Sequence, residues 1–162
     1  VSAANAAVMA RNCGEILADA DPSHAKEYHA NAEEYAAKLE ALDTEMKTAL
    51  APYRGRKIVT FHEAFPYFAA EFGFEIAAVV EREPGTEPSA KELAETIVLV
   101  RKSGIKVLFA EPQYPSVSAK AIARETGAAV FTLDPAVTGD DDRDAYISIM
   151  RRNLIALKEA FK

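Results

Sequence analysis

Residues 57–65 read KIVTFHEAF, and this segment decides the fold class that the sequence predicts. Its first five residues are mostly β-branched or apolar, which is typical of a buried strand, and the polarity changes abruptly at His62 and Glu63. In parallel sheets covered by helices, ligands bind outside the carboxyl ends of the strands, because the loops there present polar groups. His62 follows directly on such a predicted strand and is therefore the first candidate for a binding residue.

From residue 57 onward, short apolar runs alternate with amphipathic segments. The runs predict strands at 57–61, 74–80, 105–110 and 128–133, and helices are predicted at 64–72, 89–103, 116–126 and 142–162. Ser89 and Glu92 form a capping box for the second of these helices, and Gly73, Gly104 and Gly127 are expected to end the first three. This alternation predicts an α/β fold with a four-stranded parallel sheet covered by helices on both faces.

The segment before the first strand has a purely helical pattern. Met9, Cys13, Ile16 and Leu17 recur at helical spacing and predict a short amphipathic helix over 3–20. Asp21 is expected to be the N-cap of a second helix of roughly 28 residues, about 42 Å long, that ends near Pro52. The predicted division of the chain is therefore 1–20, 21–52 and 53–162.

Composition narrows the function classes. The 162 residues are 49% apolar and 27% charged, with no apolar run long enough to span a membrane, as in a water-soluble fold with one core and an appendage. A formal charge of −6 disfavours nucleic acid as a partner and makes a cation the more natural ligand. Cys13 is the single cysteine, which excludes an intrachain disulfide, and no targeting peptide is recognised.

Acidic side chains and one imidazole follow the predicted strands. They are His62 and Glu63 after the first strand, Glu81 and Glu83 after the second, Glu111 after the third and Asp134 after the fourth. Each alone is more commonly a helix cap or a satisfied side chain, but their gathering at one edge favours a metal site. Imidazole together with carboxylates suits a first-row transition metal. His24 and His29, five residues apart on the long helix, are expected to be exposed.

Two other classes stay open at this point. One is a metal-dependent hydrolase that uses His62, Glu111 and Asp134, and the other is an adhesion or structural module whose edge carboxylates only cap helices. Nucleotide binding and serine hydrolysis lack their usual backbone motifs, because the sequence has no GxGxxG, Walker or GxSxG segment.

Five motifs in order carry a resemblance to a known family: TFHEAFPYFAAEFGF (60–74), EPSAKEL (87–93), IKVLFAEPQYPSVSAKAIARETGA (105–128), TLDP (132–135) and AYISIMRRNLIAL (145–157). They resemble the C-terminal lobe of the zinc/manganese substrate-binding proteins of bacterial ABC importers, the ZnuA- and TroA-like group. Residues 4–43 resemble the end of the N-terminal lobe and the long interlobe helix of the same proteins.

The resemblance implies one metal ion held between two lobes, zinc as the expected ion and manganese as the alternative. His62 matches the histidine ligand after the first strand of the C-terminal lobe, and Asp134 matches the aspartate ligand after its last strand. Glu111 and Glu63 are then expected in the second shell or at the lobe interface, and Glu87 as a cap. Two further histidines would come from the N-terminal lobe, which this chain does not contain.

The resemblance further implies a protein that is not an enzyme, is periplasmic or extracellular and membrane-associated, and delivers its metal to an ABC permease. Without its partner lobe, the apolar stripe of the first helix is expected to be exposed and to favour self-association.

Overall fold

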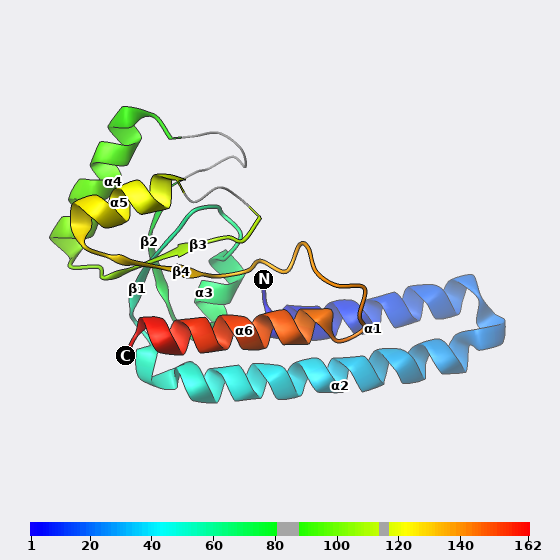
Figure 1. The fold of residues 1–162 in the computed structure, drawn as a ribbon. Coiled ribbons are helices and arrows are strands. Elements are labelled where there is room, and N and C mark those ends of the chain that lie inside the picture. The colour runs from blue at the N-terminus through cyan, green and yellow to red at the C-terminus, as the bar shows by residue number, and fades with distance from the viewer. Residues whose placement is uncertain (81–87, 114–116) are drawn as a thin grey trace. The chain divides into compact units, whose positions relative to one another are not determined.

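The computed structural model describes residues 1–80, 88–113 and 117–162, which divide into two compact units, Val1–Ala49 and Leu50–Lys162. Figure 1 traces both units. The division into three parts that the sequence predicts stays a prediction. No described helix combines the length and the apolarity that crossing a bilayer requires.

The first unit is a helical hairpin of α1 (Ala3–Ala20) and α2 (Ala25–Leu50), joined by the 3₁₀ turn η1 (Pro22–His24). Both predicted helices are confirmed. The buried residues of α1 are small ones: Ala3, Ala7, Gly14 and Ala18. A Cβ at Gly14 would lie 2.5 Å from the Cβ of Ala32, so the two helices approach each other where only glycine leaves room.

The predicted apolar stripe of α1 lies on the exposed side of the helix. Met9 is 65% exposed and Ile16 is 67% exposed, while Cys13 is also exposed. Arg11 links α1 to α2 by ion pairs, since its guanidinium donates to Glu33 at 3.0 Å and to Glu40 at 2.7 Å. These hydrogen bonds raise the pKa of Arg11 still further above its usual range.

Asp21 does not cap the second helix as the sequence predicts, because the chain makes a 3₁₀ turn before α2 begins at Ala25. Its carboxylate accepts hydrogen bonds from side chains instead: the Ser23 hydroxyl, the His24 ring at 2.6 Å and the Tyr28 hydroxyl at 3.3 Å. The bond from Ser23, followed by that from His24, holds the pKa of Asp21 below its usual value. His24 and His29 are both exposed, as predicted.

The second unit alternates strands and helices. After the 3₁₀ turn η2 (Ala51–Tyr53), its elements are β1 (Lys57–Thr60), α3 (Pro66–Phe72), β2 (Glu75–Val79), α4 (Ala90–Ser103), β3 (Val107–Ala110), α5 (Val117–Thr126), β4 (Ala129–Thr132) and α6 (Ala145–Ala160). The strands form one parallel sheet in the order β2-β1-β3-β4. The predicted fold class is confirmed, with strands one or two residues shorter than expected.

Helices cover the two faces of the sheet in pairs, α4 and α5 on one face and α3 and α6 on the other (Figure 1). Successive strand residues point to opposite faces, so Val59 and Leu108 belong to the core that α4 and α5 complete with Val100 and Ile122. On the other face the ring of Phe109 lies 6.1 Å from the ring of Phe161, centroid to centroid. β4 is an edge strand, where Val130 is 36% exposed.

Local sequence signals mark several helix ends of the second unit, but α3 and α6 begin later than the sequence predicts, at Pro66 and Ala145. Glu92 and Ser89 form the predicted capping box at the start of α4, and Gly104 ends this helix with a φ of 66°. The sequence predicts the last helix from residue 142, at the end of the acidic run 140–142, but α6 begins only at Ala145. The reason is a local turn in which an oxygen of Asp142 accepts the backbone N–H of Asp144, which keeps the run in the preceding loop.

Candidate metal site

The strand order contains one topological switch point, where the chain begins to add strands on the opposite side of the first strand. From β1 the chain moves outward to β2 and then returns past β1 to β3, so the switch point lies between the carboxyl ends of β1 and β3. Ligands bind at such points in open parallel sheets, because the flanking loops diverge there. Thr60 pairs with Phe109 in the sheet, and two residues further along each strand come His62 and Glu111.

His62 and Glu111 meet at this switch point. The Nδ1 atom of His62 lies 2.8 Å from Oε1 of Glu111, although the two residues are 49 positions apart in the chain. Both are buried, with 5% and 6% of their surfaces exposed. The Thr60 hydroxyl, also buried, donates to the carbonyl oxygen of His62 at 3.3 Å and holds the turn that follows β1.

This pairing decides what the imidazole can do. An ionised carboxylate only accepts hydrogen bonds, so in a neutral imidazole this contact favours the tautomer with the proton on Nδ1 and the lone pair on Nε2. A histidine whose other nitrogen donates to a carboxylate is the usual arrangement of a metal-binding imidazole, because the carboxylate fixes the tautomer and raises the basicity of the ring. The pair is thus suited to present Nε2 to a transition metal.

Glu63, in contrast, is exposed in the turn between β1 and α3. It makes no hydrogen bond or ion pair with any other residue that the structure describes. Glu81, Glu83 and Glu87 lie outside the described residues.

Asp134 follows β4, which is separated from β1 by β3. Its Oδ1 atom accepts the backbone N–H of Ala136 at 2.9 Å and the side-chain amide of Gln113 at 3.1 Å. The side-chain amide of Asn153 in α6 holds the backbone of Asp134. Its oxygen accepts from Asp134 N and its nitrogen donates to Asp134 O, both at 2.8 Å. The carboxylate is therefore held rigidly at the same edge of the sheet as the His62 and Glu111 pair.

Sequence reasoning missed Gln113 and Asn153. Asn153 could have been found, because it is the single amide on an apolar helix face that includes Met150, Leu154 and Leu157, and it is only 2% exposed. A buried polar residue in such a position requires partners and so indicates a structural or functional contact. Gln113 carried only a weak signal, as the second residue after Glu111 in a strand-to-helix connection.

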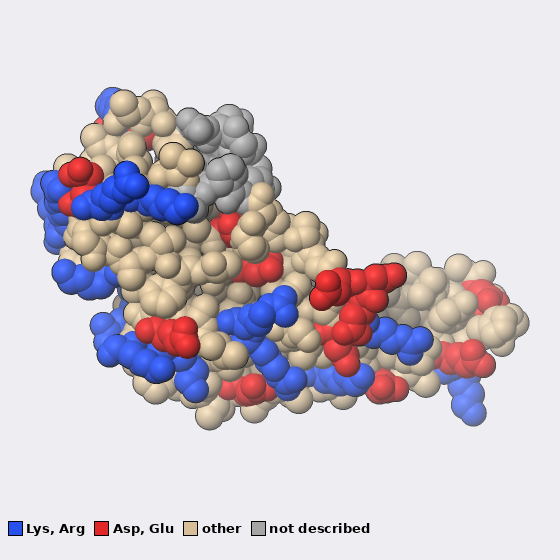
Figure 2. Space-filling view, in the orientation of Figure 1, with Lys and Arg blue, Asp and Glu red and all other residues tan. Residues whose placement is uncertain are grey.

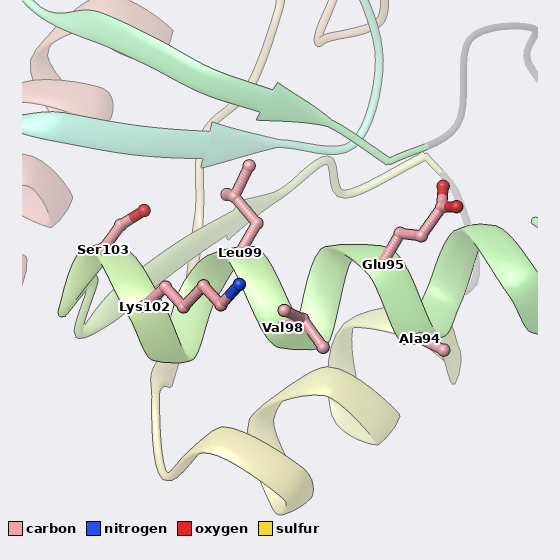
Figure 3. Close-up of a pocket in the computed structure, with 6 residues that line it drawn as sticks. All are labelled: Ala94, Glu95, Val98, Leu99, Lys102 and Ser103. Carbon is pink, nitrogen blue, oxygen red and sulfur yellow. The ribbon is translucent and has the colours of Figure 1, made fainter.

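Among the residues that the structure describes, no three histidine, cysteine or acidic side chains are grouped closely enough to hold a metal ion by themselves. Concavities between described residues also lie away from this edge, and two of them are informative. One, of about 520 Å³, is lined by α4 alone, with Val98 and Leu99 beside Glu95 and Lys102 (Figure 3). The other, of about 500 Å³, lies at the amino ends of β1 and β3 and includes Arg56, Lys57 and Lys106, which suits no cation.

Charge is distributed unevenly over the second unit. In Figure 2 acidic side chains gather over the loop that precedes α6, which contains the run 140–142. The acidic run thus lies in the same strand-to-helix connection as the candidate ligand Asp134.

A doubly wound sheet with a buried imidazole and carboxylate pair at its switch point has the arrangement of the α/β class in which ligands bind at the strand ends. Residues 1–160 match the family described as zinc-uptake complex component A, periplasmic (ZnuA). The chain belongs to this family, whose members are metal-binding substrate-binding proteins of transporters located in the periplasm or outside the cell. The resemblance seen in the sequence is confirmed.

Three known proteins illustrate the similarity. The chain is 30% identical over 156 residues to the high-affinity zinc uptake system protein ZnuA of Brucella abortus (strain 2308), covering 96% of this chain and 47% of that protein. It superposes on FpvC of Pseudomonas aeruginosa, solved in complex with Mn²⁺, with a TM-score of 0.88 and 33% identity, covering 98% of this chain and 60% of that protein. It superposes on the laminin-binding protein Lmb of Streptococcus agalactiae with a TM-score of 0.87 and 31% identity, covering 99% of this chain and 63% of that protein. The chain thus spans about half the length of the curated ZnuA relative.

Proposed function

We propose that this chain supplies one half of a transition-metal site in an extracytoplasmic substrate-binding protein, which captures zinc and delivers it to an ABC permease in the membrane. The observation that supports this proposal most directly is the hydrogen bond between His62 Nδ1 and Glu111 Oε1 at the switch point of the sheet. In this proposal His62 and Asp134 bind the metal, Glu111 orients His62, and the protein catalyses no reaction.

Zinc is the preferred cargo because of the donor types. Imidazole is a borderline ligand that suits zinc, and Asp134 adds one hard oxygen. The Brucella relative is a zinc uptake protein, whereas FpvC was solved with Mn²⁺, so the family fold by itself does not select one ion. Manganese is accordingly the competing ion in the experiments below.

Two donors make an incomplete zinc site, which requires three or four. We propose that the remaining donors come from a second lobe, for which α1 and α2 would be the remnant and the interlobe connection. Bound to His62 and Asp134 alone, the ion would keep water at its open positions, and the preorganisation of a closed cleft would be absent. Affinity should then fall by several orders of magnitude relative to the full-length protein.

The test is zinc titration calorimetry on the full-length protein and on this 162-residue chain. The full-length protein should bind one zinc ion tightly, His62→Ala should abolish that binding, and the chain alone should bind weakly. Zinc should raise the melting temperature of the full-length protein and leave that of the chain nearly unchanged. Tight stoichiometric binding by the chain alone would contradict the half-site, and failure of the full-length protein to bind any transition metal would contradict the function.

Adhesion is a second candidate, and one comparison favours it. Lmb, which this chain resembles over 99% of its length, is described as a bifunctional protein with adhesin and metal-transporting activity. Immobilised laminin offered to the full-length protein with and without zinc would test it. Binding to laminin that persists in the His62→Ala variant would establish an adhesive surface separate from the metal site.

A further inference from the structure

The loop after β4 holds Asp134 through one of its two carboxylate oxygens. Oδ1 accepts from Ala136 N at 2.9 Å and from Gln113 Nε2 at 3.1 Å, while Oδ2 makes no hydrogen bond within the described residues. A carboxylate oxygen has two lone-pair positions, so Oδ1 is saturated by these two donors. Oδ2 is the oxygen that remains available to a ligand.

Of the two donors to Asp134 Oδ1, the one from Gln113 comes from a different part of the fold. The Ala136 N–H comes from the same turn as Asp134, but Gln113 follows β3 and reaches across to the loop after β4. Its Nε2 also donates to the Thr138 hydroxyl at 2.8 Å, so one amide group bridges Asp134 and Thr138 in the loop between β4 and α6. Ala136 lies within this loop with a φ of 60°, an unfavourable angle for alanine that tertiary contacts must maintain.

The orientation of the Gln113 amide follows from its neighbours. With the amide reversed, Oε1 would face the Oδ1 atom of Asp134, and two acceptors would repel each other. In the observed orientation Oε1 is buried and has no hydrogen-bond partner in the described part of the chain. A buried acceptor without a partner is unfavourable, so the bonds of Nε2 to Asp134 and Thr138 outweigh that cost.

From this geometry we propose that Gln113 is a positioning residue that sets the metal specificity of the site. By occupying Oδ1 it limits Asp134 to a single bond through Oδ2, which keeps the coordination number low. Zinc is satisfied by four tetrahedral donors, whereas manganese prefers six. Gln113 therefore favours zinc over manganese, an inference that rests on the proposed function in which Asp134 is a metal ligand.

The test uses Gln113→Met in the full-length protein, because methionine preserves the length of the side chain and removes the N–H donors. Competition dialysis should show that the ratio of zinc affinity to manganese affinity falls roughly tenfold, since Oδ1 is freed for a second metal bond. Thr138→Val is the matched control. It removes one partner of Gln113 but keeps its bond to Asp134, and should change the ratio by less than about twofold.

A spectroscopic measurement on the unmodified protein keeps the inference testable if Gln113→Met fails to fold. Cobalt(II) bound in place of zinc should show the intense visible absorption of a four-coordinate ion. A weak, six-coordinate spectrum, or an unchanged affinity ratio in a folded Gln113→Met variant, would overturn the inference.

The proposed function fails separately, if the unmodified protein binds neither ion. Tight zinc binding that Asp134→Ala leaves unchanged would overturn the ligand role of Asp134 and with it the role of Gln113. The capture of zinc through His62 would still stand.

Discussion

Replacing Glu111 by glutamine is the most direct perturbation of the candidate site. The substitution keeps the shape of the side chain and removes its charge at a position whose side chain is only 3% exposed. Two effects on the metal-free protein oppose each other, because the hydrogen bond to His62 weakens while a buried charge is removed. The metal-free melting temperature should therefore change little.

Zinc binding should change much more. A glutamine amide can donate to Nδ1 of His62 as well as accept from it, so the ring is no longer held in the tautomer that leaves Nε2 unprotonated. Loss of such a supporting partner lowers metal affinity by about 10–100-fold. At saturating zinc this corresponds to a loss of roughly 1.4–2.7 kcal/mol of the stabilisation that the metal provides.

The assay is thermal unfolding of the full-length protein with and without zinc, together with calorimetric titration. Glu125→Gln is the matched control, since Glu125 forms an exposed ion pair with Arg101 and should affect neither measurement. A Glu111→Gln variant whose zinc affinity stays within about twofold of the unmodified protein would refute the role assigned to the pair. Equal losses in both variants would show that the effect is not specific to the site.

Three further predictions concern the helical hairpin. Gly14→Ala gains about 1 kcal/mol of helix propensity. It also places a Cβ 2.5 Å from that of Ala32, much closer than two Cβ atoms normally approach, so the overpacking cost should lie at the upper end of about 1–3 kcal/mol and exceed the gain. Urea unfolding should therefore show lower stability, which Ala32→Gly should restore. An unchanged urea midpoint would contradict the close approach of the helices. Because hydrogen bonds lower the pKa of Asp21, its stabilising effect is complete above the unfolded value of 3.8 and is lost as the pH falls through the lower folded value. Asp21→Asn should therefore flatten the dependence of the melting temperature on pH below 3.8, and an identical pH profile would count against it. Self-association through the exposed stripe should decrease in light scattering when Met9 and Ile16 are both changed to glutamine, and an unaltered mass distribution would dismiss this interface.

Local patterns in the sequence were sufficient for the secondary structure of the second unit. Apolar runs of five to seven residues separated by amphipathic segments predicted the four strands that the structure describes, and Ser89 with Glu92 predicted the start of α4. These signals are reliable because they depend on neighbours within one turn of helix or one strand. The start of α6 was predicted three residues too early, because the acidic run 140–142 can serve equally as a helix cap or as a loop.

The candidate site depends on contacts that no local pattern contains. The position of His62 at a strand end was readable from residues 57–65, but the identity of its partner required the strand order β2-β1-β3-β4, which makes β3 the neighbour of β1. Any of the acidic residues after the strands could have filled that position in another order. Only the tertiary structure selected Glu111 and left Glu63 exposed.

For Asp134 and for α1 as well, the sequence indicated the residues and the tertiary structure decided their contacts. The motif TLDP indicated the carboxylate, but the amides that hold it come from Gln113 and Asn153, which lie 21 and 19 residues away. In α1 the apolar period marked the stripe of Met9 and Ile16, yet the face that packs on α2 is the one with Gly14, because close approach of two helices requires small side chains more than apolar ones. Periodicity in a sequence reports which faces of an element differ, and the shapes of the neighbouring elements decide which of those faces is buried and which side chains meet.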